Sequence, residues 1–164
     1  MASFLMFHGL TSALRTKIKG FSVNIISGGE KLPNGGEKSS PVRVLVVDDE
    51  ALIRWSLVQT LNDSGHETSE AVDAAGAIRA VRDASRPFDV ALLDLRLPDS
   101  RGLELLSEVR RLTPRTQVIL MTAYGTPEIV QGALDMGAFR VVGKPVEMSD
   151  ITALVAKASG APSN

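Results

Sequence analysis

Four short segments of the 164-residue chain contain side chains that could carry out chemistry together. They are the acidic run Asp48-Asp49-Glu50, the carboxylate of Asp94, the hydroxyl of Thr122 and the ammonium group of Lys144. Each comes at or just after the end of a run of apolar residues. If those runs are parallel strands, their carboxyl ends lie at one edge of a sheet, where such sheets bind ligands. The sequence therefore predicts one polar site assembled from four distant parts of the chain.

The residue types at this site favour one kind of chemistry. Clustered carboxylates raise each other's pKa unless a cation neutralises them, and a pocket of hard oxygen ligands suits Mg²⁺. A carboxylate beside Mg²⁺ with Lys and Thr around it supplies a nucleophilic oxygen, a bridging metal and donors for the remaining negative charge, as phosphoryl transfer requires. Asp94 is the expected nucleophile because it is central and faces the other groups, and the product would be an acyl phosphate.

The pattern of the surrounding sequence predicts the elements that position these groups. Strands are indicated at residues 42–47, 67–71, 88–93, 117–121 and 139–142. Amphipathic spacing between them indicates helices, with Asp73 as one N-cap and a last helix at about residues 149–158. Five repeats of strand and helix predict an α/β fold. We expect a doubly wound, flavodoxin-like, five-stranded parallel sheet in the order 2-1-3-4-5, because right-handed crossovers leave few topologies.

The composition divides the chain into three parts. Residues 42–158 form the predicted domain, residues 159–164 are expected to be a frayed tail, and residues 1–41 are expected to be a disordered extension. The extension ends in a linker rich in Gly, Ser and Pro at Ser27–Pro41. Alternatives for the segment before the linker are a partner-binding or membrane-surface helix, a secretory segment, or residues added by an upstream start codon.

The overall composition excludes several classes of protein. The sequence has no Cys, which excludes a disulfide scaffold and a thiol enzyme. Its apolar runs are shorter than the roughly 18 residues that a membrane span needs. A net charge of -1 gives no overall basic field for a nucleic-acid backbone. We therefore expect neither direct nucleic-acid binding nor stable membrane insertion, and we expect a cytoplasmic location.

Four motifs carry a resemblance to a known family. The segments VLVVDDE, LLDLRLPDSRGLELL, VILMTAYG and GKP, in this order and spacing, resemble the CheY-like receiver domain of bacterial two-component response regulators. The resemblance covers residues 42 to about 158. The segments RWSLVQTL and LLDLRLPDSRGLELL are most similar to receivers of the nitrogen-regulation type. The resemblance implies the flavodoxin-like fold and a phosphoryl group taken from a sensor histidine kinase or a phosphotransfer protein.

The resemblance also implies a role for individual residues. Asp94 would be the phosphoacceptor. The Mg²⁺ ligands would be Asp48, Asp49, Asp94 and the backbone carbonyl of Arg96, with Asp49 the more direct ligand of the acidic pair. Thr122 would be the switch hydroxyl that moves to the phosphoryl oxygen, and Lys144 the ammonium group that pairs with that oxygen. A cis peptide bond at Pro145 would aim Lys144 into the pocket.

Three further positions bear on how the site works. Arg96 and Tyr124 lie two residues beyond Asp94 and Thr122, and neither can act as a general base near neutral pH. We expect both side chains to cover the site and to lengthen the lifetime of the phosphorylated state. Val141 stands three residues before Lys144, where the family usually has an aromatic residue that swings inward when the Thr moves. Coupling of phosphorylation to the rest of the domain through Tyr124, or through the segment after residues 117–121, is therefore an alternative to this Thr–aromatic switch.

The resemblance places the output on one face, formed by the helix at residues 127–136, the strand at 139–142 and the helix at 149–158. Candidate contacts with a downstream target protein are Gln131, Asp135, Arg140 and Met148. A phosphorylation-dependent dimer is a further expectation. We expect Trp55, on the first helix, to be partly buried packing.

Three functions remain open at this point. The first is a stand-alone receiver that acts by protein docking and catalyses only its own phosphorylation and dephosphorylation, because the sequence after the last helix is short. The second is the receiver piece of a longer transcription regulator. The third is a phosphatase with an aspartyl-phosphate intermediate, but that class needs a second Asp two residues after the nucleophile, where this chain has Arg96. A degenerate receiver that only binds is disfavoured, because all the phosphorylation residues are present.

Overall fold

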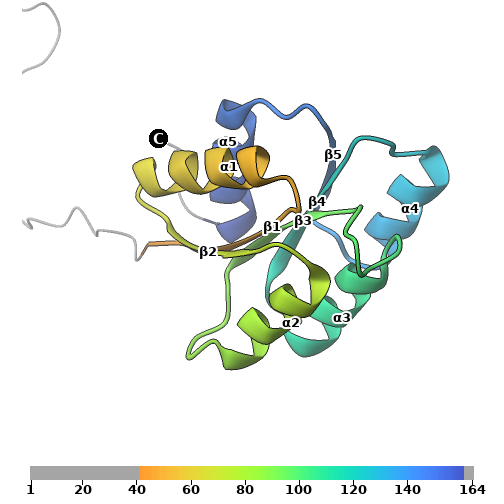
Figure 1. Ribbon diagram of the computed structural model, residues 1–164, viewed down its shortest axis with the longest axis horizontal. Helices are drawn as coiled ribbons and strands as arrows, with labels where there is room; N and C mark the ends of the chain where they lie inside the picture. The colour runs from red at the N-terminus through yellow and green to blue at the C-terminus, as the bar shows by residue number, and fades with distance from the viewer. Residues whose placement is uncertain (1–40, 161–164) are drawn as a thin grey trace, which may run out of the picture. The chain divides into compact units, whose positions relative to one another are not determined.

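The computed structural model describes residues 41–160. The predicted N-terminal extension up to residue 40 and the tail from residue 161 lie outside the described residues. The elements, labelled in Figure 1, are β1 (Arg43–Val47), α1 (Ala51–Asp63), β2 (Glu67–Ala71), α2 (Ala74–Asp83), β3 (Val90–Asp94), α3 (Glu104–Leu112), β4 (Gln117–Thr122), α4 (Pro127–Asp135), β5 (Arg140–Gly143) and α5 (Met148–Ser159). Within these residues, no helix combines the length and the apolar character that a membrane crossing requires.

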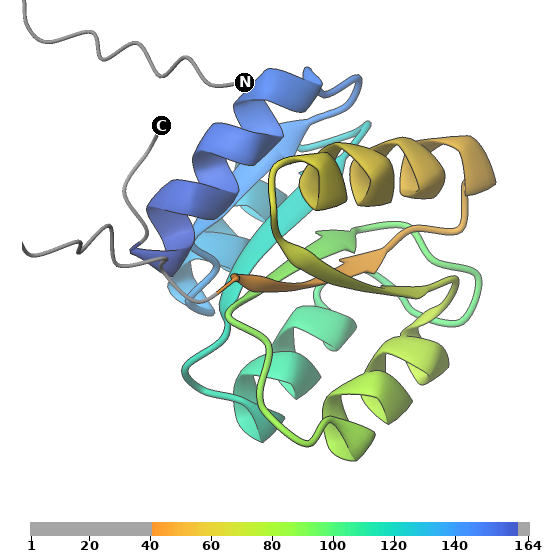
Figure 2. The ribbon, with the colours of Figure 1, turned by 90° about the vertical axis from the view of Figure 1, so that its left-hand side faces the viewer.

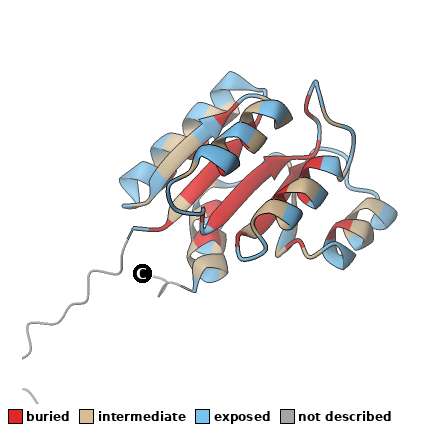
Figure 3. Ribbon diagram, turned by 90° about the horizontal axis from the view of Figure 1, so that it is seen from below, coloured by how far each residue is buried: buried red, intermediate tan, exposed pale blue. Residues whose placement is uncertain are grey.

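The strands form one parallel sheet in the order β2-β1-β3-β4-β5, which confirms the predicted fold. Helices α1 and α5 lie on one side of the sheet, and α2 and α3 lie on the other side with α4 (Figures 1 and 2). Side chains alternate along β1, so Val44 and Val46 belong to the core under α1 and α5, whereas Leu45 and Val47 belong to the opposite core. A sheet covered on both faces needs strands that are apolar along most of their length. Strand β3 is accordingly buried along its length, and β1 is buried from Val44 onward; Figure 3 shows buried strands at the centre of the domain.

Each helix buries only one stripe of its surface. On α1 the fully buried residues are Leu57 and Leu61, with Ile53 partly buried on the same stripe. Trp55 is 61% exposed, so the expectation that it is partly buried packing is wrong. It lies two residues from both Ile53 and Leu57, which turns its side chain by about 200° around the helix and away from the sheet.

The boundaries of some elements differ from the sequence predictions. Strand β3 begins at Val90 and includes Asp94, and Phe88 is buried ahead of the strand rather than within it. Helix α5 includes Ser159 and is capped by Gly160, whose φ of 72° is in the left-handed region that glycine adopts readily. The first two residues of the expected tail therefore belong to the folded domain.

The N-terminus of α2 is held by two carboxylates. Asp73 is the N-cap, as predicted, and accepts a hydrogen bond of 2.6 Å from the amide of Gly76. A Cβ atom on Gly76 would lie 2.8 Å from the Asp73 carboxylate oxygen, so a larger residue here would displace the capping side chain. Asp99, from the β3–α3 loop, accepts hydrogen bonds of 2.8 and 2.9 Å from the amides of Ala74 and Ala75. These bonds lower the pKa of Asp99 and satisfy amides that have no partner within the helix.

Candidate functional site

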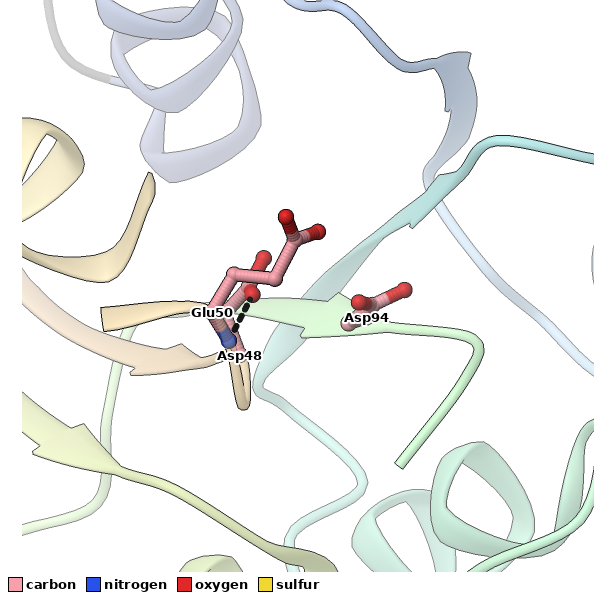
Figure 4. Close-up of side chains that lie close together, drawn as sticks. All are labelled: Asp48, Glu50 and Asp94. Atoms are coloured by element: carbon pink, nitrogen blue, oxygen red, sulfur yellow. Dashed lines mark hydrogen bonds between the residues drawn. The ribbon is translucent and has the colours of Figure 1, made fainter. Parts of the chain in front are cut away.

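The four segments singled out in the sequence meet at the carboxyl edge of the sheet. Lys144 follows β5, and its ammonium nitrogen lies 2.8 Å from Asp48 Oδ2 and 2.7 Å from Asp94 Oδ2. Glu50, at the start of α1, is a third acceptor at 3.3 Å. Figure 4 shows Asp48, Glu50 and Asp94 close together at this edge. The expected convergence of carboxylates around one ammonium group is therefore present.

Burial sets the electrostatics of this cluster. Asp48 is fully buried, and burial raises its pKa although a hydrogen bond from Lys144 and another from the amide of Glu50 oppose the shift. Burial alone would lower the pKa of Lys144, but its hydrogen bonds to Asp48 and Asp94 outweigh burial and raise that pKa. Lys144 therefore stays charged. One ammonium group cannot neutralise three neighbouring carboxylates, so the cluster favours a further cation.

The arrangement fits a divalent metal ion. Asp48, Glu50 and Asp94 each offer a carboxylate oxygen, and these oxygens lie within 4.8 Å of one another. All of these donors are hard oxygens, which suit Mg²⁺ better than softer metals. Asp49, the acid expected to bind the metal more directly, is exposed and lies outside this group of three. Glu50, for which the sequence predicted no separate role, lies inside it.

A pocket of about 260 Å³ opens beside the cluster. Its lining residues are Asp49, Glu50, Asp94, Arg96, Ala123, Tyr124 and Lys144. The guanidinium carbon of Arg96 lies 4.3 Å from the centre of the Tyr124 ring, which is the geometry of a cation–π contact. Both side chains are exposed, and they come from different loops, after β3 and after β4. The two residues expected to cover the site thus contact each other at the pocket.

Thr122 ends β4 and is 3% exposed. Its hydroxyl oxygen accepts a hydrogen bond of 3.0 Å from the Tyr124 amide, and its carbonyl accepts one of 2.7 Å from the Lys144 amide. Thr122 is not among the residues that line the pocket. The peptide bond between Lys144 and Pro145 is cis, as expected. Val141 is half-buried and packs in the core on the side of α2, α3 and α4.

The expected output face is only partly available to a partner. Gln131, Asp135 and Arg140 are exposed, and the Gln131 amide donates a hydrogen bond of 2.8 Å to Asp135. Met148 is half-buried and packs against the core under α1 and α5. Part of the Met148 side chain therefore serves packing rather than a surface contact.

Comparison with known proteins agrees with the fold and identifies the family. The family described as the response regulator receiver domain matches residues 44–156. The chain belongs to this family, whose members serve two-component signal transduction and are phosphorylated by histidine kinases or phosphotransfer proteins.

The relatives differ in length. The DNA-binding transcriptional regulator NtrC of Escherichia coli is 36% identical over 115 residues, which are 70% of this chain and 24% of NtrC. Sporulation initiation phosphotransferase F of Bacillus subtilis is 33% identical over 115 residues, which are 70% of this chain and 91% of that protein. A CheY-like receiver domain from Methanospirillum hungatei superposes with a TM-score of 0.70 at 31% identity, covering 74% of this chain and 95% of that one. The chain spans about a quarter of the length of the larger relatives.

Proposed function

We propose that this protein accepts a phosphoryl group on Asp94, with Mg²⁺, from the phosphohistidine of a sensor histidine kinase or a phosphotransfer protein. The observation that carries the proposal is the position of Lys144, whose ammonium nitrogen bridges Asp48 and Asp94 at 2.8 and 2.7 Å beside an open pocket. This places a positive charge next to the carboxylate that would receive the phosphoryl group.

The transfer would be a displacement at phosphorus. A carboxylate oxygen of Asp94 attacks the phosphorus atom, the bond from phosphorus to the donor nitrogen breaks, and the imidazole leaves with the electron pair of that bond. The acyl phosphate keeps the incoming phosphoryl oxygens within reach of Lys144. Asp48, Asp49, Asp94 and the Arg96 carbonyl would hold Mg²⁺, as in the family, and Glu50 is placed to join them. The ion would supply positive charge for the phosphoryl oxygens.

The consequence of phosphorylation would be a change of shape that is read by another protein. Lys144 and Thr122 would turn toward the phosphoryl oxygens, and the face formed by α4, β5 and α5 would bind a downstream target or a second copy of the chain. Val141 occupies the position of the usual aromatic residue, so another residue must link Thr122 to α4. Tyr124 is the candidate, since its amide already donates a hydrogen bond to the Thr122 hydroxyl. We propose no catalysis beyond the protein's own phosphorylation and dephosphorylation.

Two kinds of whole protein fit this domain. The match to 91% of sporulation initiation phosphotransferase F supports a stand-alone receiver that acts by docking to another protein. The match to 24% of NtrC supports the alternative, the receiver piece of a longer transcription regulator. A phosphatase with an aspartyl-phosphate intermediate is disfavoured, because the exposed Arg96 stacks on Tyr124 where that chemistry needs an acid.

The proposal is tested by labelling the protein with radioactive acetyl phosphate and Mg²⁺. We expect label that is lost in acid and in base and is absent from Asp94→Asn. The matched control is Asp89→Asn, the same substitution next to the opposite end of β3, where Asp89 accepts a hydrogen bond from the Arg43 amide. Equal labelling of Asp94→Asn and wild type would refute the assignment.

A further inference from the structure

Arg54 connects the acidic run Asp48-Asp49-Glu50, which forms the loop between β1 and α1, to β2 through a largely buried guanidinium group. It lies on α1, and its side chain is 15% exposed. Its Nη1 donates a hydrogen bond of 2.8 Å to the backbone carbonyl of Asp48, and its Nε donates one of 3.0 Å to the carboxylate of Glu70 on β2. The planar guanidinium group thus contacts two separate parts of the chain in a fixed geometry.

The carbonyl that Arg54 contacts belongs to the peptide between Asp48 and Asp49. The other polar groups of Asp48 are also engaged. Its amide donates to Ala71 on β2 at 3.2 Å, its Oδ1 accepts from the Glu50 amide at 2.9 Å, and its Oδ2 accepts from Lys144 at 2.8 Å. Arg54 therefore supplies the contact that fixes the direction in which the chain leaves Asp48 toward Asp49 and Glu50.

We propose that Arg54 is a positioning residue for the metal site. By holding the Asp48 carbonyl it orients the peptide that leads to Asp49 and Glu50, so that the carboxylates of this loop converge on one ion. Glu70 holds Arg54 in turn. The inference rests on the proposed function, because it concerns the same Mg²⁺ site.

The charge of Arg54 and its orienting contact would change the Mg²⁺ affinity in opposite directions. Arg54 is a cation near a cation site, so its removal would strengthen Mg²⁺ binding if Coulomb repulsion were its main influence. Loss of orientation weakens binding instead. The sign of the change in affinity therefore separates the two roles.

The test measures Mg²⁺ affinity by titration calorimetry without a phosphodonor, for wild type, Arg54→Ala and Arg54→Lys. We expect Arg54→Ala to bind Mg²⁺ about tenfold more weakly, as is common when a group that orients a ligand is removed. Arg54→Lys should also bind more weakly, because an ammonium group keeps the charge but not the two-point contact. Arg54→Lys supplies the same test if Arg54→Ala does not fold.

The matched control is Arg111→Ala. Arg111 also pairs with a glutamate, Glu108 on α3, but it is exposed and away from the site. Its removal should leave Mg²⁺ affinity unchanged. Glu70→Gln should weaken affinity less than Arg54→Ala, and adding it to Arg54→Ala should cause no further loss, because Glu70 acts through Arg54.

A kinetic measurement distinguishes positioning from general damage. In the labelling assay, the Mg²⁺ concentration for half-maximal rate should rise about tenfold in Arg54→Ala, while saturating Mg²⁺ restores the wild-type rate. Unchanged or tighter Mg²⁺ binding in the folded variant, or a rate that saturating Mg²⁺ does not restore, would overturn the inference. The proposed function fails on a different result, the absence of label from wild-type Asp94, whatever the affinities are.

Discussion

The contact between Arg96 and Tyr124 predicts the lifetime of the phosphorylated state. Hydrolysis needs a water molecule in line with the bond between phosphorus and Asp94, and both side chains line the pocket through which that water would arrive. If the stacked pair must separate before water attacks, the energy of the contact adds to the barrier. Replacing Tyr124 by Ala removes the ring and should speed the loss of phosphate.

The magnitude follows from the geometry. The guanidinium carbon is 4.3 Å from the ring centre and Tyr124 is 63% exposed, so the contact belongs to the exposed class of cation–π interactions. Such contacts contribute about 0.5 to 1 kcal/mol. A barrier lowered by that amount corresponds to a rate increase of about two- to fivefold.

The assay follows the decay of radioactive label after removal of the phosphodonor. Tyr124→Phe is the matched control, because it keeps the ring and should retain the wild-type lifetime. Arg96→Ala should accelerate decay about as much as Tyr124→Ala, and the double variant should not exceed the larger single effect by much, because each substitution already breaks the pair. Unchanged decay in the double variant, or equally fast decay in Tyr124→Phe, would refute the reasoning.

Three other predictions concern the metal, the switch and stability. Asp49→Ala should weaken Mg²⁺ binding at least about tenfold in calorimetry, since it removes a proposed ligand, whereas Asp63→Ala at the far end of α1 should not; equal affinities would remove Asp49 from the site. Thr122→Ala and Lys144→Ala should still accept some label but should lose the phosphorylation-dependent changes in amide hydrogen exchange across α4, β5 and α5. Each variant loses a hydrogen bond to the phosphoryl group, worth about 1.5 to 3 kcal/mol where a charge is involved, and exchange changes equal to those of wild type would contradict this. Asp99→Ala should lower the free energy of unfolding by about 1 kcal/mol in urea titrations at pH 7, the usual effect of losing such a cap. The pKa of Asp99 is lowered in the folded state, so its contribution is present above the unfolded value of 3.8 and is lost as pH falls through the folded value; a difference from wild type that persists unchanged below that range would count against the role of its charge.

The topology was predictable because its signal is local. A strand buried on both faces is apolar along nearly all of its length, and β3 and β4 meet this condition apart from Asp94, Gln117 and Thr122 at their ends. Short apolar runs separated by amphipathic segments then leave few ways to connect a parallel sheet. The error at Trp55 has the opposite origin. An aromatic side chain is apolar wherever it lies, and only its angle around α1 relative to Leu57 and Leu61 shows that it faces away from the core.

The site was predictable in part. The ends of parallel strands share an edge, so the approach of Asp48, Asp94 and Lys144 follows from the order of the strands alone. The roles of these residues in phosphorylation remain predictions. The contacts of Arg54 and Asp99 could not be foreseen. The Arg54 guanidinium group reaches six residues back along the chain and the Asp99 carboxylate reaches 25 residues back, and such contacts leave no periodic pattern in the sequence.

The stability of helix α2 depends on a residue that is synthesised after the helix itself. It has ten residues and contains Gly76 in its first turn, so in isolation it is below the length at which helices persist in water. Two of its first amides find their acceptor in Asp99, which leaves the ribosome 25 and 24 residues later. A nascent chain that ends before this residue lacks the anchor. Helix α2 and the loop after β3 therefore become stable as one unit, and in the finished protein they should open together, so exchange of the α2 amides reports on the loop that follows Asp94.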